Sequence, residues 1–143
     1  MNLTLDLSHV PGRIRVVPIP EWPGLWHWGL EDWHKDGPGM PMMWHSPKGG
    51  RVSCTAYVDF DRGSQFSRFL WTPETYEQQV SVLQRIESIQ GLPWHLTAAN
   101  CEQVVRWAVE GKPRSMQLEV GFFTAVGAAL LLAFAMKGKL TSF

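Results

Sequence analysis

The stretch LTAANCEQVVRWAVEG, residues 96–111, places a cysteine where small and polar residues give way to a helical pattern. Thr97 and Asn100 are both types of residue that cap helix N-termini, and Gly111 is the usual type at a C-terminal cap. An apolar face with helical spacing lies beside the cysteine: Val104, Val105 and Ala108. The pattern predicts a helix that begins at about Thr97 or Asn100, ends at Gly111 and points Cys101 inward from its first turn.

Cysteine is rare in this chain, since Cys54 and Cys101 are the only two among 143 residues. Small secreted domains held together by disulfides carry more cysteines, and the opening residues lack the basic start and apolar core of a signal peptide. We therefore expect a cytoplasmic location. Apolar residues make up 45% of the chain and charged residues 18%, which is typical of a globular domain. Thirteen basic residues balance thirteen acidic ones, so we expect no nucleic-acid partner.

Strands and turns are expected in the first third of the chain, which is rich in proline, glycine and tryptophan. The run RVSCTAYVDF, residues 51–60, alternates apolar and polar residues. This alternation predicts a half-buried strand with Cys54 on its apolar face. Cys54 is thus expected to behave as a small core residue.

A further helix is predicted in residues 72–91, with Thr72 as its N-cap, Pro73 in the first helical position and Gly91 as its stop. Its apolar stripe is expected to face the core: Tyr76, Val80, Leu83 and Ile86. Together these patterns predict an α+β domain. In this domain a small antiparallel sheet packs on two helices, and an apolar C-terminal helix follows.

A position at a helix N-terminus favours the thiolate form of Cys101 and so a role as nucleophile, because the free N–H groups and the helix dipole there stabilise negative charge. A nucleophilic cysteine also needs a base for its proton, and the chain offers five histidines: His9, His27, His34, His45 and His95. Spacing alone does not choose among them, and it leaves Cys101 equally open to an ordinary buried role. No close-spaced pair of cysteines or histidines indicates a structural zinc site, so we expect neither a metal nor a cofactor.

Three motifs are informative together: HWGL from His27, WHSP around His45, and NCEQVVRWAVEG in residues 100–111. The combination resembles the lecithin retinol acyltransferase-like family, whose members are relatives of the NlpC/P60 peptidases. In that family an early histidine in an HWA-type strand, a histidine on a neighbouring strand and a cysteine in a late NCEHF-type helix start follow in this order. The resemblance extends from about Trp26 to Lys137, and it implies a circularly permuted papain-like fold.

The resemblance implies that Cys101 is the nucleophile, that His27 is the general base and that His45 orients His27. Cys101 would attack an ester or amide carbonyl and hold the acyl group as a thioester until water or another acceptor collects it. The implied function is a cysteine-dependent acyltransferase or phospholipase-like hydrolase with an acyl lipid as substrate. Two alternatives remain open: a cysteine peptidase or amidase of the NlpC/P60 kind, and a non-enzymatic module that inserts into a membrane or binds a partner.

The chain departs from the family pattern in several places. Gly29 stands where the HWA motif has alanine, and Gln103 stands where the NCEHF motif has histidine. The two histidines of the motifs are also farther apart than is usual in the family, which we attribute to a longer turn rich in glycine and proline. This longer connection leaves Asp32 and His34 as rivals of His45 for the third catalytic position.

An uncharged apolar run, VGFFTAVGAALLLAFAM, begins at Val120 and ends at Met136. As a helix it would span about 25 Å, slightly less than the roughly 30 Å hydrocarbon core of a bilayer. Its length also fits a buried core helix, but the resemblance favours a membrane anchor because many members of the family carry such a segment. We therefore predict a catalytic domain in residues 1–118 and an apolar segment in residues 119–143 that associates with a membrane.

Overall fold

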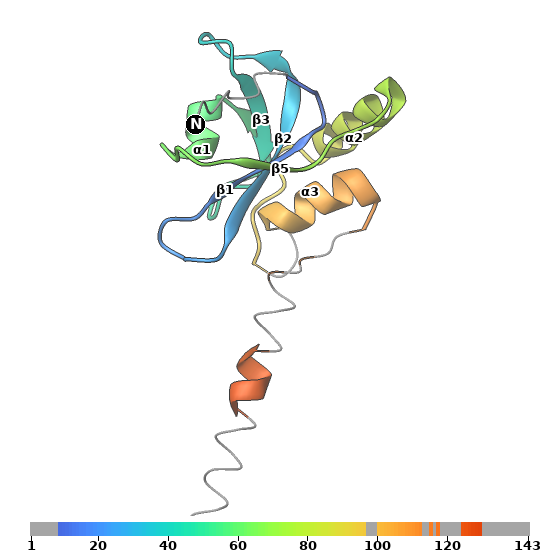
Figure 1. Cartoon of the computed structure of the whole chain (residues 1–143). Coiled ribbons are helices and arrows are strands. Elements are labelled where there is room, and N and C mark those ends of the chain that lie inside the picture. The colour runs from blue at the N-terminus through green and yellow to red at the C-terminus, as the bar shows by residue number, and fades with distance from the viewer. Residues whose placement is uncertain (1–8, 97–99, 113–114, 116, 118–123, 130–143) are drawn as a thin grey trace, which may run out of the picture.

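The computed structural model describes residues 9–96, 100–112, 115, 117 and 124–129, and it contains one sheet and several helices (Figure 1). The strands are β1 (Ile14–Pro18), β2 (Trp26–Lys35), β3 (Pro41–His45), β4 (Ser53–Thr55) and β5 (Arg68–Trp71). The labelled helices are α1 (Tyr57–Asp61), α2 (Tyr76–Ser88) and α3 (Cys101–Glu110). Residues 124–129 are helical as well, and their side chains are mostly exposed.

The strands form a five-stranded antiparallel sheet in the order β4-β3-β2-β1-β5. Side chains alternate between the two faces of a strand, and residues paired across the ladder share a face. Val16 pairs with Trp28 on the face that α2 and α3 cover, whereas Val17 pairs with His27 on the face that carries α1. The predicted α+β class and small antiparallel sheet are therefore confirmed.

The main core lies between the sheet and helices α2 and α3. Its residues come from both sides of this interface and include Trp28, Leu30 and Trp44 of the sheet, and Leu83, Ile86, Val104 and Val105 of the helices. A smaller cluster on the opposite face joins Val17, Met43 and Phe60. The start of β2, at Trp26 and His27, lies beside a cavity.

The sequence predicts a continuous strand in residues 51–60, and this prediction is wrong. Only β4 is a strand, and the chain then enters α1, which ends at Arg62 in a left-handed conformation with φ of 52°. In α1, Tyr57 and Phe60 lie one turn apart and pack on the same side of the helix, with Phe60 fully buried. An alternating pattern and a single helical turn are indistinguishable over so few residues.

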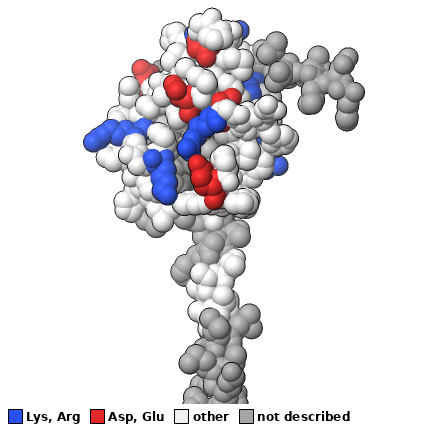
Figure 2. Space-filling view, turned by 90° about the vertical axis from the view of Figure 1, so that its left-hand side faces the viewer, with Lys and Arg blue, Asp and Glu red and all other residues white. Residues whose placement is uncertain are grey.

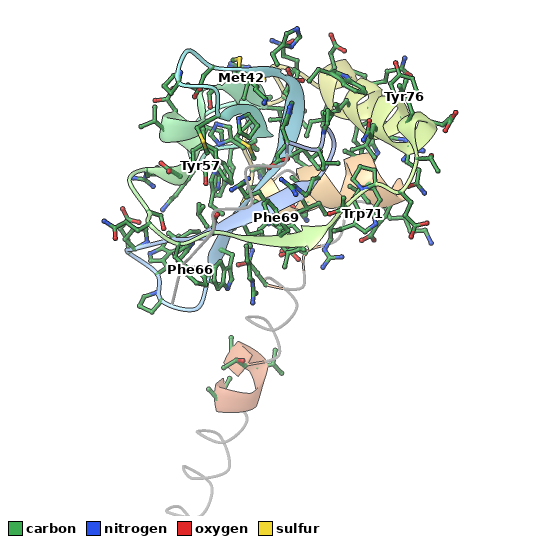
Figure 3. All side chains as sticks on the ribbon, turned by 45° about the horizontal axis from the view of Figure 1, so that its top comes forward. Met42, Tyr57, Phe66, Phe69, Trp71 and Tyr76 are labelled. Atoms are coloured by element: carbon green, nitrogen blue, oxygen red, sulfur yellow. The ribbon has the colours of Figure 1, made fainter. Side chains whose placement is uncertain are left out.

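Helix α2 begins later than the sequence predicts. Its N-cap is Thr75 rather than Thr72, because the Thr75 hydroxyl accepts a hydrogen bond from the backbone N–H of Gln78 at 3.2 Å. Tyr76 is consequently not a core residue: it is 66% exposed, its ring contacts that of Trp33 at a tilt, and it lies on the outside of the domain (Figure 3). The buried residues of α2 are Val82, Leu83 and Ile86.

The prediction for α3 is confirmed, with Asn100 as the N-cap and Gly111 as the C-cap. The Asn100 side chain accepts from the Gln103 N–H at 2.9 Å, and the Gln103 side chain accepts from the Asn100 N–H at 3.1 Å. This capping box gives a physical role to Gln103. It also fixes the point at which the helix starts, and therefore the position of Cys101.

Among the residues described here, no helix combines the length and the apolar character that crossing a bilayer requires. Of the apolar segment in residues 120–136, only residues 124–129 are described, so the predicted anchor lies mostly outside the described residues. In Figure 1 this helical stretch lies apart from the sheet and its helices. Membrane association remains a prediction.

Candidate functional site

His27 and His45 lie on neighbouring antiparallel strands and share one face of the sheet. His27 is near the start of β2, and His45 is the last residue of β3, opposite Gly29. Their rings are in contact, with His27 Nε2 and His45 Nδ1 2.8 Å apart. The prediction that a long turn separates His27 from His45 in the sequence is wrong. Most of the separation is strand, because β2 continues to Lys35 and a short turn then leads into β3.

A row of hydrogen-bonding groups runs from Thr55 through His45 to His27. The Thr55 hydroxyl lies 3.4 Å from the Ala56 carbonyl, to which it donates, and 2.9 Å from His45 Nε2. When the hydroxyl donates to this carbonyl, it accepts from the ring, and His45 then carries its proton on Nε2 and accepts at Nδ1. His27 then donates from Nε2, which leaves an unprotonated Nδ1. This tautomer is the one that a general base requires.

Phe60 of α1 keeps the histidine pair in place. Its ring centroid lies 5.2 Å from that of His27 and 5.6 Å from that of His45. Gly29 makes this approach possible, since a Cβ at that position would lie 2.7 Å from Phe60 Cε2 and 3.1 Å from Met43 Cε. The glycine in HWGL is therefore required by the close packing of α1 on β2.

Substituting alanine for Gly29 should displace Phe60 and destabilise the fold by about 1–3 kcal/mol, as overpacked cores do. The unfolding midpoint in urea measures this loss. Gly37→Ala is the matched control, because nothing lies within 4 Å of a Cβ at Gly37. Equal midpoints for the two variants would show that Phe60 does not depend on the glycine.

Cys101 is buried at the start of α3 and lies against the part of β2 that carries His27. Its Sγ is 4.0 Å from the Trp26 carbonyl oxygen, and the Trp28 backbone N–H is hydrogen-bonded to the sulfur. Within the described part of the chain, Sγ makes no hydrogen bond to either imidazole. The thiol thus contacts the peptide groups on both sides of His27, with its S–H turned to Trp26.

The side chains of Cys101, His27 and His45 are all uncharged at neutral pH. Burial raises the pKa of the Cys101 thiol to about 11, although the N–H groups of Trp28, Glu102 and Cys101 itself act to lower it. The expectation of a lowered thiol pKa is therefore wrong, because desolvation outweighs the helix N-terminus. Burial also lowers the pKa of His27 to about 3 and that of His45 to about 4.

His27, His45 and Cys101 all line one cavity of about 540 Å³. This volume is in the usual range of small-molecule sites. Much of the lining is apolar and includes Val17, Ile19, Trp22, Leu25, Trp26 and Leu96. Charged residues of both signs also line it: Glu21, Lys48, Asp59, Asp61 and Arg62. Acidic and basic side chains are likewise adjacent on the face shown in Figure 2.

The two rivals of His45 lie elsewhere. Asp32 shares its sheet face with Trp28 and accepts a hydrogen bond from Trp44 Nε1 at 2.8 Å. Its other carboxylate oxygen is 2.7 Å from Nδ1 of His34, whose side chain is 78% exposed. Neither residue lines the cavity. The structure places His27, His45 and Cys101 in the lining of one cavity, and it leaves Asp32 and His34 outside that lining.

Sequence reasoning missed residues that support this constellation. Thr55 orients His45, but the contact depends on the pairing of β3 with β4, which the sequence does not reveal. Gln117 also lines the cavity, and it bonds to both backbone groups of Trp26. Buried Glu102 accepts from Ser115 Oγ and from the Gln117 N–H. Its place directly after Cys101 in the NCE motif was the available signal.

Comparison with protein-family models, with curated proteins and with solved structures finds no match to this chain.

Proposed function

We propose that the chain is a cysteine-dependent acyl hydrolase or acyltransferase with the permuted papain-like fold of the lecithin retinol acyltransferase-like family. The observation that carries the proposal is the row from Thr55 through His45 to His27, which ends in the cavity that Cys101 also lines. The chain order of the two histidines and the cysteine supports the fold assignment. So does a cysteine at the start of a helix that packs on the sheet.

The proposed reaction begins from a neutral thiol and a neutral imidazole. As Cys101 Sγ attacks the acyl carbonyl carbon, its proton passes to Nδ1 of His27 and the carbonyl electron pair moves onto oxygen. His45 accepts from Nε2–H and so holds the His27 ring in a fixed orientation during the transfer. When the tetrahedral intermediate collapses, the leaving group takes the proton from His27 and the acyl group remains on Cys101 as a thioester.

The cavity favours an acyl chain as the group transferred. Its apolar wall would contact the chain, and the charged residues of both signs in its lining would contact a polar or zwitterionic head. An acyl lipid fits this division better than a peptide, which the same cysteine and histidine would serve in an amidase. The apolar segment in residues 120–136 would hold the enzyme at the membrane where such substrates lie.

The pH dependence of turnover tests the role of His27. Because the pKa of His27 is lowered to about 3 and that of Cys101 is raised to about 11, both groups keep their reactive neutral forms across the physiological range. We expect kcat/KM for a short-chain acyl ester to change less than about twofold between roughly pH 5.5 and 8. Circular dichroism at each pH would confirm that the chain is folded. A fall to half activity near pH 6.5 would indicate an unperturbed histidine and contradict the assignment.

A further inference from the structure

Gln117 holds the first residue of β2 by two hydrogen bonds. Its Oε1 accepts from the Trp26 N–H at 2.8 Å, and its Nε2 donates to the Trp26 carbonyl at 3.3 Å. This pairing fixes the orientation of the amide, because the peptide group of Trp26 offers one donor and one acceptor. The nitrogen therefore lies on the side of the Trp26 carbonyl.

Cys101 Sγ contacts the same carbonyl oxygen, at 4.0 Å. The amide nitrogen of Gln117 and the proposed nucleophile are thus neighbours of one atom, and both residues line the cavity. An amide nitrogen carries two N–H groups, of which the Trp26 carbonyl accepts one. No partner for the other N–H of Gln117 is found among the residues that the structure describes.

Gln117 is held rigidly enough to act as a fixed donor. Glu102, which is fully buried, accepts from the Gln117 backbone N–H at 3.2 Å and from Ser115 Oγ at 2.7 Å. The same carboxylate is paired with Arg106 at 3.0 Å. The residue next to the nucleophile in α3 therefore ties the chain after α3 to the start of that helix. A donor positioned in advance is what stabilisation of a developing charge requires.

We propose that Gln117 Nε2 is an oxyanion donor, acting together with the backbone N–H of Cys101. This assignment rests on the proposed function, since an oxyanion forms only when Sγ attacks a carbonyl. The Sγ–carbon bond forms, the carbonyl electron pair moves to oxygen, and the thiol proton goes to His27. The Cys101 N–H already points toward its own sulfur, where it lowers the thiol pKa. The second N–H of Gln117 belongs to the nitrogen that donates to the Trp26 carbonyl, the same carbonyl that Sγ contacts.

The test compares two reactions of Cys101 in the full-length chain. Acylation by p-nitrophenyl butyrate passes through an oxyanion, whereas alkylation by iodoacetamide displaces iodide and forms none. Gln117→Met removes the donor without adding charge, and Gln117→Ala is a second variant. We expect the acylation rate to fall about 10²–10³-fold in both, with alkylation changed less than about threefold. Gln84→Met, on the exposed surface of α2, is the matched control.

The outcomes separate the possible roles. Equal losses in acylation and alkylation would overturn the proposal, because they would show that Gln117 only positions the start of β2. Unchanged acylation in folded Gln117→Met or Gln117→Ala would overturn it as well. A wild-type chain that reacts with iodoacetamide but with no acyl ester would overturn the proposed function itself. An active wild type with equally active Gln117 variants would overturn only the assignment of Gln117.

Discussion

Alanine in place of Cys101 should lower acyl turnover by about 10⁴-fold or more, since no other group lining the cavity can form the thioester. Glutamine in place of His27 should cause a loss of similar size, because a thiol whose pKa is about 11 is almost fully protonated without a base. The two losses should not add in the double variant, because the residues act as one unit. Steady-state hydrolysis of a short-chain ester measures all three.

Cys54→Ala is the matched control for this experiment. It removes the same thiol from a half-buried position in β4 that packs against the main core, and it leaves the cavity lining unchanged. We expect near wild-type turnover for this variant. Full activity of Cys101→Ala, or equal losses in the two cysteine variants, would remove Cys101 from the mechanism. An inactive wild type on every acyl donor would favour the non-enzymatic membrane or partner-binding module.

Acid should destabilise this protein strongly between about pH 6.5 and 4. Burial lowers the pKa of His27 to about 3 and that of His45 to about 4, from an ordinary value of 6.5. In this window the unfolded chain binds protons at both positions and the folded chain does not. The free energy of unfolding therefore rises with pH, by about 1.4 kcal/mol per pH unit for each histidine. The combined loss on acidification is several kcal/mol, a large part of the stability of a small domain.

Urea unfolding at a series of pH values measures this slope. His27→Gln and His45→Gln should each make the dependence on pH shallower, because glutamine does not titrate. His34→Gln is the control, since the His34 side chain is 78% exposed. A slope that is unchanged in His27→Gln and His45→Gln would show that the two buried histidines are not the source of the acid sensitivity.

The helix at the nucleophile could be predicted from sequence because its determinants are local. Asn100, Gln103 and Gly111 cap the helix within a short segment, and its apolar face repeats with helical period. Residues 51–60 show the opposite case. There the packing of Phe60 on the two histidines decides between strand and helix, and that contact depends on strands β2 and β3. The choice between Thr72 and Thr75 as N-cap also depended on a hydrogen bond that two similar residues could offer.

The candidate site was predictable only in part. Five histidines gave no choice by spacing, and His27 and His45 were selected through a family resemblance; their pairing became visible when β2 and β3 aligned. The sign of the Cys101 pKa shift was missed, because a helix N-terminus can be read from sequence whereas the degree of burial cannot. Gln117 was missed since its partner Trp26 is remote in sequence.

The central claim is that Cys101 carries an acyl group during turnover. Mass spectrometry of the intact chain, quenched in acid within the first turnovers of p-nitrophenyl butyrate, tests it directly. The account predicts a single adduct with the mass of the butyryl group, located on the peptide that contains Cys101, released by neutral hydroxylamine and absent in Cys101→Ala. Turnover without an adduct, or with an adduct that persists in Cys101→Ala, would contradict it.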